Sequence, residues 1–229
     1  MKYHKIKQGF FISRPNRFLA NVMLDGKVEV CHVKNTGRCK ELLIEGAVVF
    51  LEESKNPKRK TKYDLIAIYK DDRLVNIDSQ APNKVVQEYL PQIFHDVICI
   101  RPETKYKNSR FDFYVETKEN KIFVEVKGVT LEDNGVVRFP DAPTERGLKH
   151  IQELVTCKKE GYQAVIIFVV QMENVVCFEP NMQAQPEFAR ELYLAKKAGV
   201  EILCFDCRVT PESLEINRKV PCKIESINL

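Results

Sequence analysis

The sequence predicts two domains, a small β-barrel over residues 1–82 and an α/β domain with a mixed sheet over residues 83–229. Two observations predict this division. Short strand-like segments joined by turns fill the first part, whereas apolar strands alternate with amphipathic helices in the second. The length of 229 residues suffices for two small domains, and a hydrophobic content of 44% can supply a core for each.

The first part is predicted to contain five short strands. The clearest signal is a hairpin, in which Asp25-Gly26 favours a tight turn between residues 21–24 and residues 27–33. Such a set of strands, with little helical periodicity, fits a small barrel, of which the oligonucleotide/oligosaccharide-binding (OB) fold is one type. The other three strands are expected over residues 47–52, 62–69 and 74–77.

The second part alternates helices and strands after a boundary near residues 79–83. Its helices are expected over residues 84–93, 142–160 and 186–198. Residues 164–170 are wholly apolar, which predicts a strand buried on both faces. The other strands are expected over residues 110–116, 121–131, 136–139 and 200–205, with residues 175–178 as a candidate to continue the same sheet.

Charge and hydropathy narrow the function classes. The net charge is +4, divided into +6 over residues 1–82 and −2 over residues 83–229, which indicates that the first part meets a polyanion. No apolar run approaches the ~20 residues of a membrane span, and the N-terminus has no apolar signal-peptide core. We therefore expect a soluble cytoplasmic protein with no membrane partner, and association with the nucleoid is an alternative.

A pair of charges interrupts one apolar strand. Glu125-Val-Lys127 lies inside residues 122–127, where buried and unpaired charges would cost several kcal/mol. Five other acidic residues also stand two positions before a lysine, but they lie in or beside turns and polar stretches. The context, rather than the spacing, therefore marks this pair as a candidate site.

The preceding strand supplies a second carboxylate. A two-residue turn at residues 118–119 would place Asp112 opposite Glu125, whereas a turn at residues 119–120 would place it opposite Lys127. Because side chains alternate along a strand, either register puts the two carboxylates and the lysine on one face. The opposite face of the preceding strand is then expected to carry Phe111, Phe113 and Val115.

Neighbouring carboxylates repel each other unless a cation lies between them, and Mg²⁺ takes one or two carboxylates together with a phosphate. Asp112 and Glu125 are therefore candidate metal ligands in phosphodiester hydrolysis. Lys127 would orient or deprotonate water, or stabilise developing negative charge. The alternative is a surface face that holds one salt bridge between Asp112 and Lys127.

These residues carry a resemblance. Asp112…Glu125-x-Lys127 resembles the active-site motif of the PD-(D/E)xK nuclease superfamily, and much of the chain is similar to the sugar fermentation stimulation protein A family. The resemblance implies an OB-like barrel, a PD-(D/E)xK nuclease-like α/β domain and DNA binding without sequence specificity. The matching segments are Arg14-Pro-Asn-Arg-Phe18, Asn35-Thr-Gly-Arg38, Ala81-Pro-Asn83, Arg101-Pro-Glu-Thr-Lys105, Asn108-Ser-Arg-Phe-Asp112, Val124-Glu-Val-Lys127, Phe139-Pro-Asp-Ala, Thr144-Glu-Arg-Gly147 and Lys149-His150.

The resemblance also assigns roles to single residues. It makes Asp112 and Glu125 metal ligands and Lys127 the catalytic lysine, and it offers Glu103 as a further acid; the alternative for Glu103 is a loop carboxylate paired with Lys105. We interpret His150 as a packed or surface histidine. Phosphate contact and base stacking suit a set of basic, polar and aromatic residues, namely Arg14, Asn16, Arg17, Phe18, Asn35, Thr36, Arg38, Thr144 and Arg146.

The resulting hypothesis is a DNA-binding protein without sequence specificity that carries a Mg²⁺- or Mn²⁺-dependent nuclease site. One alternative is a non-catalytic DNA-binding regulator of sugar metabolism genes with a vestigial site, and another is an RNA-processing factor. The strandedness of the DNA and the oligomeric state stay open, and a homodimer is one option.

Overall fold

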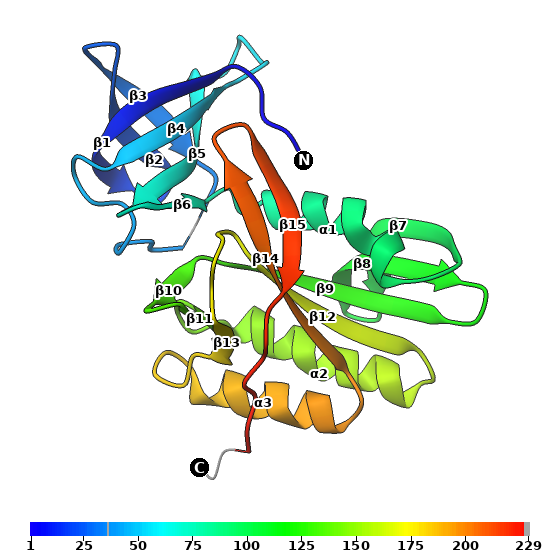
Figure 1. Cartoon of the computed structure of the whole chain (residues 1–229). Helices are drawn as coiled ribbons and strands as arrows, with labels where there is room; N and C mark the ends of the chain where they lie inside the picture. Colours follow the sequence, from blue (N-terminus) through cyan, green and yellow to red (C-terminus); the bar gives the residue numbers. More distant parts are fainter. Residues whose placement is uncertain (36, 227–229) are drawn as a thin grey trace.

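The structure is a computed structural model that describes residues 1–35 and 37–226. Figure 1 shows a β-barrel, formed by the N-terminal part of the chain, beside a larger unit in which helices cover both faces of a sheet. The predicted fold class, an OB-type barrel followed by an α/β domain with a mixed sheet, is confirmed. Within the described residues, no helix combines the length and the apolarity needed to cross a membrane.

The barrel closes through five strands. The sheet order is β3-β2-β1-β4-β5-β6, and a pairing between β3 and β5 closes the ring, so that β6 extends β5 outside it. The predicted hairpin is confirmed, with Leu24 paired to Lys27. The strands are β1 (Ile6–Asn16), β2 (Leu19–Leu24), β3 (Lys27–Val33), β4 (Val48–Glu53), β5 (Tyr63–Lys70) and β6 (Arg73–Asn76).

Strand β1 is absent from the sequence-based prediction, which took β6 as the fifth strand. The alternation of apolar and polar residue types along β1 is weak, because Phe10 is apolar although it is exposed, and it stands next to the buried Phe11. Gly9 explains part of this irregularity: a Cβ atom there would lie 2.7 Å from Val22 Cγ1 and 2.8 Å from the Met23 carbonyl oxygen. The glycine thus allows β1 to approach β2 closely.

The second unit is built on a six-stranded sheet in the order β15-β14-β12-β9-β8-β7. The central strands β9, β12 and β14 are parallel, and antiparallel strands flank them on both sides. The strands of this sheet are β7 (Val97–Tyr106), β8 (Ser109–Thr117), β9 (Lys121–Val129), β12 (Gln163–Val170), β14 (Glu201–Thr210) and β15 (Ser213–Lys219).

Two sequence-based predictions for this region are wrong. The strand expected over residues 121–131 ends at Val129, and residues 175–178 do not continue the main sheet. Instead β10 (Leu131–Asp133), β11 (Val136–Phe139) and β13 (Cys177–Pro180) form a separate three-stranded sheet. The physical reason is the barrel, which occupies the place beyond the last β9–β12 pair: the Asn76 N–H donates to the Gln171 carbonyl at 2.9 Å.

Helices cover both faces of the main sheet (Figure 1). Helix α1 (Ala81–Ile93) packs Val85, Val86 and Leu90 on one face. Helix α2 (Glu145–Lys159) packs Ile151, Leu154 and Cys157 on the other, and α3 (Pro186–Lys197) packs against α2. Apolar residues of the parallel strands β12 and β14 are therefore buried on both sides, as the sequence predicted for residues 164–170.

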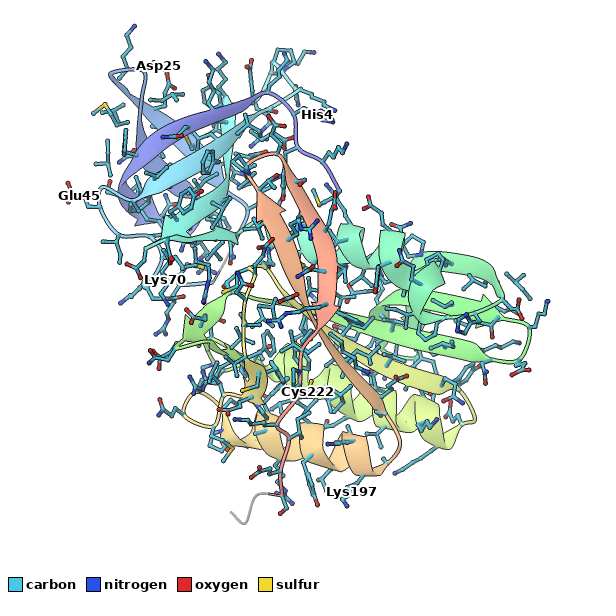
Figure 2. All side chains as sticks on the ribbon, viewed as in Figure 1. His4, Asp25, Glu45, Lys70, Lys197 and Cys222 are labelled. Atoms are coloured by element: carbon cyan, nitrogen blue, oxygen red, sulfur yellow. The ribbon has the colours of Figure 1, made fainter. Side chains whose placement is uncertain are left out.

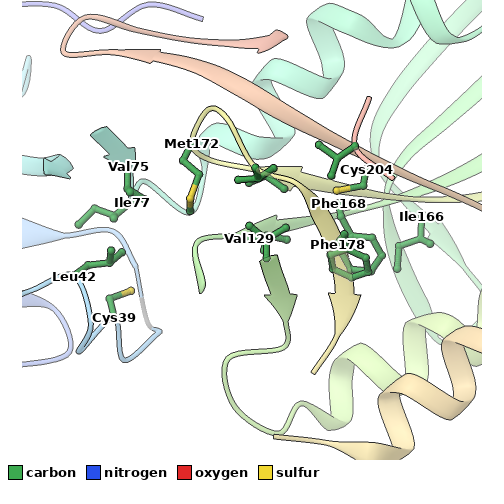
Figure 3. Close-up of a cluster of buried hydrophobic side chains, with 14 of the residues drawn as sticks. Cys39, Leu42, Val75, Ile77, Val129, Ile166, Phe168, Met172, Phe178 and Cys204 are labelled. Carbon is green, nitrogen blue, oxygen red and sulfur yellow. The ribbon is translucent and has the colours of Figure 1, made fainter. Parts of the chain in front are cut away.

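The barrel and the sheet domain share one hydrophobic core. Figure 3 shows Leu42 and Ile77 of the barrel facing Val129 and Met172, and the cluster continues to Phe168 in the middle of the sheet. The barrel is therefore packed against the carboxyl ends of β9 and β12, and its position relative to the sheet is fixed by burial.

An ion-pair cluster also links the two domains. Lys70 Nζ and Arg73 Nη1 each lie 2.8 Å from the carboxylate of Glu132 on β10, which also accepts from the Gly135 N–H at 2.6 Å. Figure 2 shows Lys70 on the side of the barrel that faces the second domain. Burial would raise the pKa of Glu132, but the hydrogen bonds from Lys70, Gly135 and Arg73 lower it to about 2.

This cluster predicts an acid-dependent loss of stability. Because folding lowers the pKa of Glu132 from 4.5 to about 2, its contribution is complete above pH 4.5 and is lost as the pH falls towards 2. We expect Glu132→Gln to cost about 1–3 kcal/mol at neutral pH and to flatten the acid dependence, as measured by urea unfolding at a series of pH values. Glu45→Gln, at an exposed position, is the control; equal acid dependence in both variants would contradict the assignment.

Candidate active site

The candidate site forms where strands β8 and β9 separate. Their ladder runs from Glu116↔Lys121 to Phe113↔Val124, and the Thr117 N–H donates to the Asn120 carbonyl at 2.9 Å. Of the two turns that the sequence left open, the structure therefore has the one at residues 118–119, whose register puts Asp112 opposite Glu125. Beyond this ladder, a side-chain oxygen replaces a backbone acceptor: Asp112 Oδ2 accepts from the Val126 N–H at 2.7 Å.

The prediction that Asp112 simply shares one face with Glu125 and Lys127 is wrong in detail. Phe113 packs on the α1 face, but Phe111 packs on the α2 face against Phe123, with ring centroids 5.4 Å apart. The alternation of β8 thus breaks at Asp112. Because its carboxylate bonds a strand N–H, which points along the sheet, it lies in the gap between the two strands rather than on either face.

The neighbouring strand is irregular at the same level. The pairs Pro102↔Phe113 and Thr104↔Phe111 put Glu103 of β7 opposite Asp112, and Glu103 has a left-handed backbone with φ 50°. This conformation costs a residue with a side chain about 1–2 kcal/mol, and such distortions concentrate at functional sites. The side chain of Glu103 is 63% exposed and pairs with Arg110 at 3.6 Å, so the structure does not bring it to Asp112, Glu125 or Lys127.

Glu125 lies at the centre of a buried polar group. Its residue is 2% exposed, its Oε1 accepts from Lys127 Nζ at 2.6 Å, and the same oxygen contacts Nδ1 of His150 on α2. Because an ionised carboxylate only accepts, Nδ1 of His150 carries the proton. The second oxygen, Glu125 Oε2, is buried and has no hydrogen-bond partner among the described residues.

The pKa values of the two carboxylates are shifted in opposite directions. Burial and the nearby charge of Glu125 raise the pKa of Asp112 to about 6. Burial would raise the pKa of Glu125 too, but the hydrogen bond with His150 and the charge of Lys127 outweigh it and hold that pKa below its usual value. Two coupled carboxylates, one of them retaining a proton close to neutrality, are a pair that a cation would stabilise.

Sequence reasoning missed two members of the site. Asn83, in the first turn of α1, donates through Nδ2 to Asp112 Oδ1 at 2.7 Å. His150 was interpreted as packed or at the surface; it is buried, and its contact with Glu125 shows that it belongs to the site. Both lie in segments that carried the family resemblance, which was the only signal that could have found them.

The barrel residues predicted to contact nucleic acid fall into two groups. Arg14 is structural: its Nη1 and Nη2 atoms donate to the carbonyl oxygens of residues 17, 35, 37 and 38 at 2.7–2.8 Å. Both terminal nitrogens of Arg14 are used inside the protein and its Nε is buried, so the expected phosphate contact by Arg14 is replaced by a role in holding two loops together. Asn35 is likewise engaged, since its side chain bonds the Gly37 N–H and the Ile77 carbonyl.

The second group faces solvent. Arg17 and Arg38 are exposed, Phe18 is 51% exposed, and the Arg17 guanidinium lies 5.6 Å from the centroid of the Phe18 ring. The side chain of Asn16 stabilises the turn between β1 and β2, because its Oδ1 accepts from the N–H groups of residues 18 and 19. Thr36 lies outside the described residues.

The helix residues predicted to hold phosphate are also divided. Thr144 is the N-cap of α2: its hydroxyl accepts from the Gly147 N–H at 3.0 Å. Arg146 is exposed, and its Nε lies 3.5 Å from His150 Nε2, at the outer limit of a hydrogen bond. Arg146 is therefore the helix cation next to the buried carboxylate group.

A cleft of about 190 Å³ lies between the barrel and the sheet domain, and Gly128, the residue after Lys127, is part of its lining. Asn35 and Gly37 line it from the barrel, and Gly128, Asp141 and Gln171 line it from the other side. Arg14 donates to the carbonyl oxygens of both Arg17 and Asn35. The exposed Arg17 therefore lies at the same end of the barrel as Asn35, which lines the cleft.

Asp112 and Glu125 are the two carboxylates that lie together where β8 and β9 separate. Across residues 1–35 and 37–226, no group of three or more His, Cys, Asp and Glu side chains could hold a metal ion. A cation bound by one or two carboxylates and otherwise by water and phosphate is the arrangement that suits Mg²⁺.

Comparisons with known proteins agree with the fold. Residues 12–77 match the family model described as the SfsA N-terminal OB domain, and residues 80–213 match that of the sugar fermentation stimulation protein RE domain. Similar curated proteins, both named sugar fermentation stimulation protein homolog, come from Clostridium beijerinckii (61% identity over 94% of this chain and 96% of the relative) and Ruminiclostridium cellulolyticum (55%, over 98% and 100%). The solved structure of Pyrococcus furiosus SfsA in complex with Ca²⁺ is 27% identical, with TM-score 0.88 over 98% of each chain.

The two arginines of the barrel predict opposite outcomes. Arg14→Ala removes the donors of four carbonyl groups, so we expect a loss of about 2–4 kcal/mol in the free energy of urea unfolding. Arg17→Ala, at an exposed side chain, should stay within about 0.5 kcal/mol of the parent. Equal losses in the two variants would show that Arg14 does not organise the loops.

Proposed function

The chain belongs to the sugar fermentation stimulation protein family, and we propose that it binds DNA without sequence specificity and hydrolyses phosphodiester bonds with the help of Mg²⁺ or Mn²⁺. The observation that carries this proposal is the convergence of Asp112, Glu125 and Lys127 where two strands separate, with the buried Glu125 Oε2 lacking a partner among the described residues.

A divalent cation fits the residues present. A buried carboxylate oxygen without a partner is costly, and a hard cation is the partner that would satisfy it. Burial, and after it the charge of Glu125, raises the pKa of Asp112 to about 6, and a bound cation would offset both effects. The Ca²⁺ complex of the Pyrococcus furiosus relative supports a divalent ion in this family.

The side chains divide the work of phosphodiester hydrolysis. Asp112 and Glu125 would hold the cation, which when bound supplies a Lewis acid for the phosphate and lowers the pKa of a water molecule. Lys127, held 2.6 Å from Glu125 Oε1, stabilises negative charge that develops on the phosphate oxygens. His150 on α2 positions Glu125 through its hydrogen bond to Oε1, and Asn83 on α1 positions Asp112 through its hydrogen bond to Oδ1.

The barrel supplies the contacts that hold the nucleic acid. Exposed Arg17 and Arg38 neutralise phosphates, and the exposed ring of Phe18 offers a stacking surface, which together give binding without base readout. Arg146 adds a cation beside the carboxylates. An OB-type barrel suits DNA and RNA alike; DNA is the polymer that we propose, and RNA is the alternative that the experiment separates.

Cleavage of labelled oligonucleotides tests the hydrolysis. We expect wild-type protein with Mg²⁺ or Mn²⁺ to cut DNA and chelator to abolish cutting. Asp112→Asn, Glu125→Gln and Lys127→Met should each lower the rate by about 100-fold or more, because each removes charge from the transition state. Glu103→Gln is the matched control and should cut at the parental rate, since its exposed carboxylate lies apart from the site.

Three outcomes of this assay have different meanings. Binding without cleavage by the wild-type protein would contradict hydrolysis and leave a non-catalytic DNA-binding regulator. Cleavage that the three substitutions do not reduce would place the chemistry elsewhere. Cleavage of RNA in preference to DNA of the same sequence would favour an RNA-processing factor.

The salt dependence of binding tests the barrel surface. Each lost phosphate contact lowers the slope of log K against log salt by about 0.7–0.9, so the double variant of Arg17→Ala and Arg38→Ala should reduce it by about 1.4–1.8. Phe18→Ala should weaken binding with little change of slope, because stacking releases no counterions. Arg190→Ala, on the exposed side of α3, is the control; a slope change equal to that of the barrel variant would contradict this surface.

A further inference from the structure

The interdomain cleft beside Lys127 has the size and lining of a pocket for one base. We propose that it accepts the base of an unpaired nucleotide that carries an exocyclic amino group, with cytosine as the best fit. This inference rests on the proposed function and narrows it: the barrel contacts read no base, whereas the cleft would add a preference for one unpaired base of single-stranded DNA next to the cleavage site.

The position of the cleft connects it to the candidate active site. Gly128 and Val129 continue β9 directly after Lys127 and form one wall. The barrel loop at Asn35 and Gly37 forms the opposite wall, and Arg14 holds that loop in place. A nucleotide next to a phosphate at Lys127 is therefore within reach of this cleft.

The lining presents hydrogen-bond acceptors without partners among the described residues. Gln171 is 2% exposed; its Nε2 donates to Asn76 Oδ1 at 2.8 Å and to the Asp78 carbonyl at 3.0 Å, which fixes the amide orientation. Its Oε1 therefore points to the Gly128 side, where a Cβ atom on the glycine would lie only 2.6 Å away. No hydrogen bond reaches this oxygen from the described residues.

A second acceptor faces the cleft from the segment before α2. Asp141 Oδ2 would lie 2.9 Å from a Cβ atom on Gly37, so the carboxylate stands at the junction with the barrel loop. Its oxygens likewise accept no hydrogen bond from the residues that the structure describes. Two acceptors that have no partner among residues 1–35 and 37–226, one of them charged, match an exocyclic amino group and oppose the carbonyl groups that flank the single N–H of thymine.

The size of the cleft favours an unpaired base. The volume of about 190 Å³ lies below the ~300–1,000 Å³ of usual ligand pockets, so it suits one ring system rather than a base pair. A base inside a duplex is stacked and paired, and it would have to be flipped out to enter. Single-stranded DNA avoids this cost.

Binding without metal tests the pocket separately from hydrolysis. Fluorescence anisotropy in chelator would compare labelled dC10 and dT10, which have the same length and similar flexibility. We expect dC10 to bind about tenfold more tightly, because good contacts to a base edge discriminate by that order. The duplexes dC10·dG10 and dT10·dA10 should bind alike.

Two kinds of variant identify the pocket as the source of the preference. Leu131→Trp adds bulk to the lining and should reduce the preference to less than twofold, whereas the matched Leu131→Ala leaves the cleft open and should retain it. Asp141→Asn, at an exposed position, converts an acceptor oxygen into a donor and should lower the dC10 preference without weakening dT10 binding. Thermal unfolding checks that each variant is folded.

The outcomes separate this inference from the proposed function. Equal binding of dC10 and dT10 by wild-type protein, or a preference that both Leu131→Trp and Asp141→Asn retain, would overturn the pocket. A preference that follows the variants as expected supports the pocket even if neither oligonucleotide is cut with Mg²⁺, which would overturn hydrolysis alone.

Discussion

The separation of β8 from β9 at Asp112 is the constraint on which the candidate site depends. If the ladder continued, the Val126 N–H would bond to the backbone of β8, and the strands would leave no gap for a ligand. Instead a carboxylate bonds that N–H at 2.7 Å, and the break in alternation turns Phe111 to the face opposite Phe113. Because the side chain of Asp112, rather than the backbone of β8, accepts this hydrogen bond, the two strands separate and a negative charge lies near Glu125.

The barrel packs next to the gap between β8 and β9, at the carboxyl end of β9. Ligands of open α/β sheets bind beyond the carboxyl ends of parallel strands, and here the barrel closes off that edge through the shared core around Val129 and Met172 (Figure 3). Gln171 couples the two domains directly, because its backbone bonds Asn76 and Val129 while its side chain bonds Asn76 again. The cleft is therefore built by both domains together.

The sequence limited the register to two possibilities and did not predict the break in it. A short polar turn between two apolar strands placed Asp112 opposite either Glu125 or Lys127, and the structure has the register that places it opposite Glu125. The edge strands β7 and β15 were missed because each has a solvent-exposed side and little alternation, and Pro102 further weakens the signal in β7. The division between Arg14 and Arg17 was also beyond the sequence, since only the folded loops show which guanidinium meets carbonyl groups.

The buried charges of the site are not explained by a gain in the free energy of folding. Glu125 stands in a strand whose neighbours are packed in two hydrophobic layers, and an apolar residue there would avoid the cost of desolvating a carboxylate, an ammonium group and an imidazole. The left-handed backbone at Glu103 and the Glu125 Oε2 atom, which has no partner among the described residues, add further cost at the same level of the sheet. A strand that carries three buried ionisable side chains beside a cleft lined by both domains is therefore better explained by what binds there than by stability.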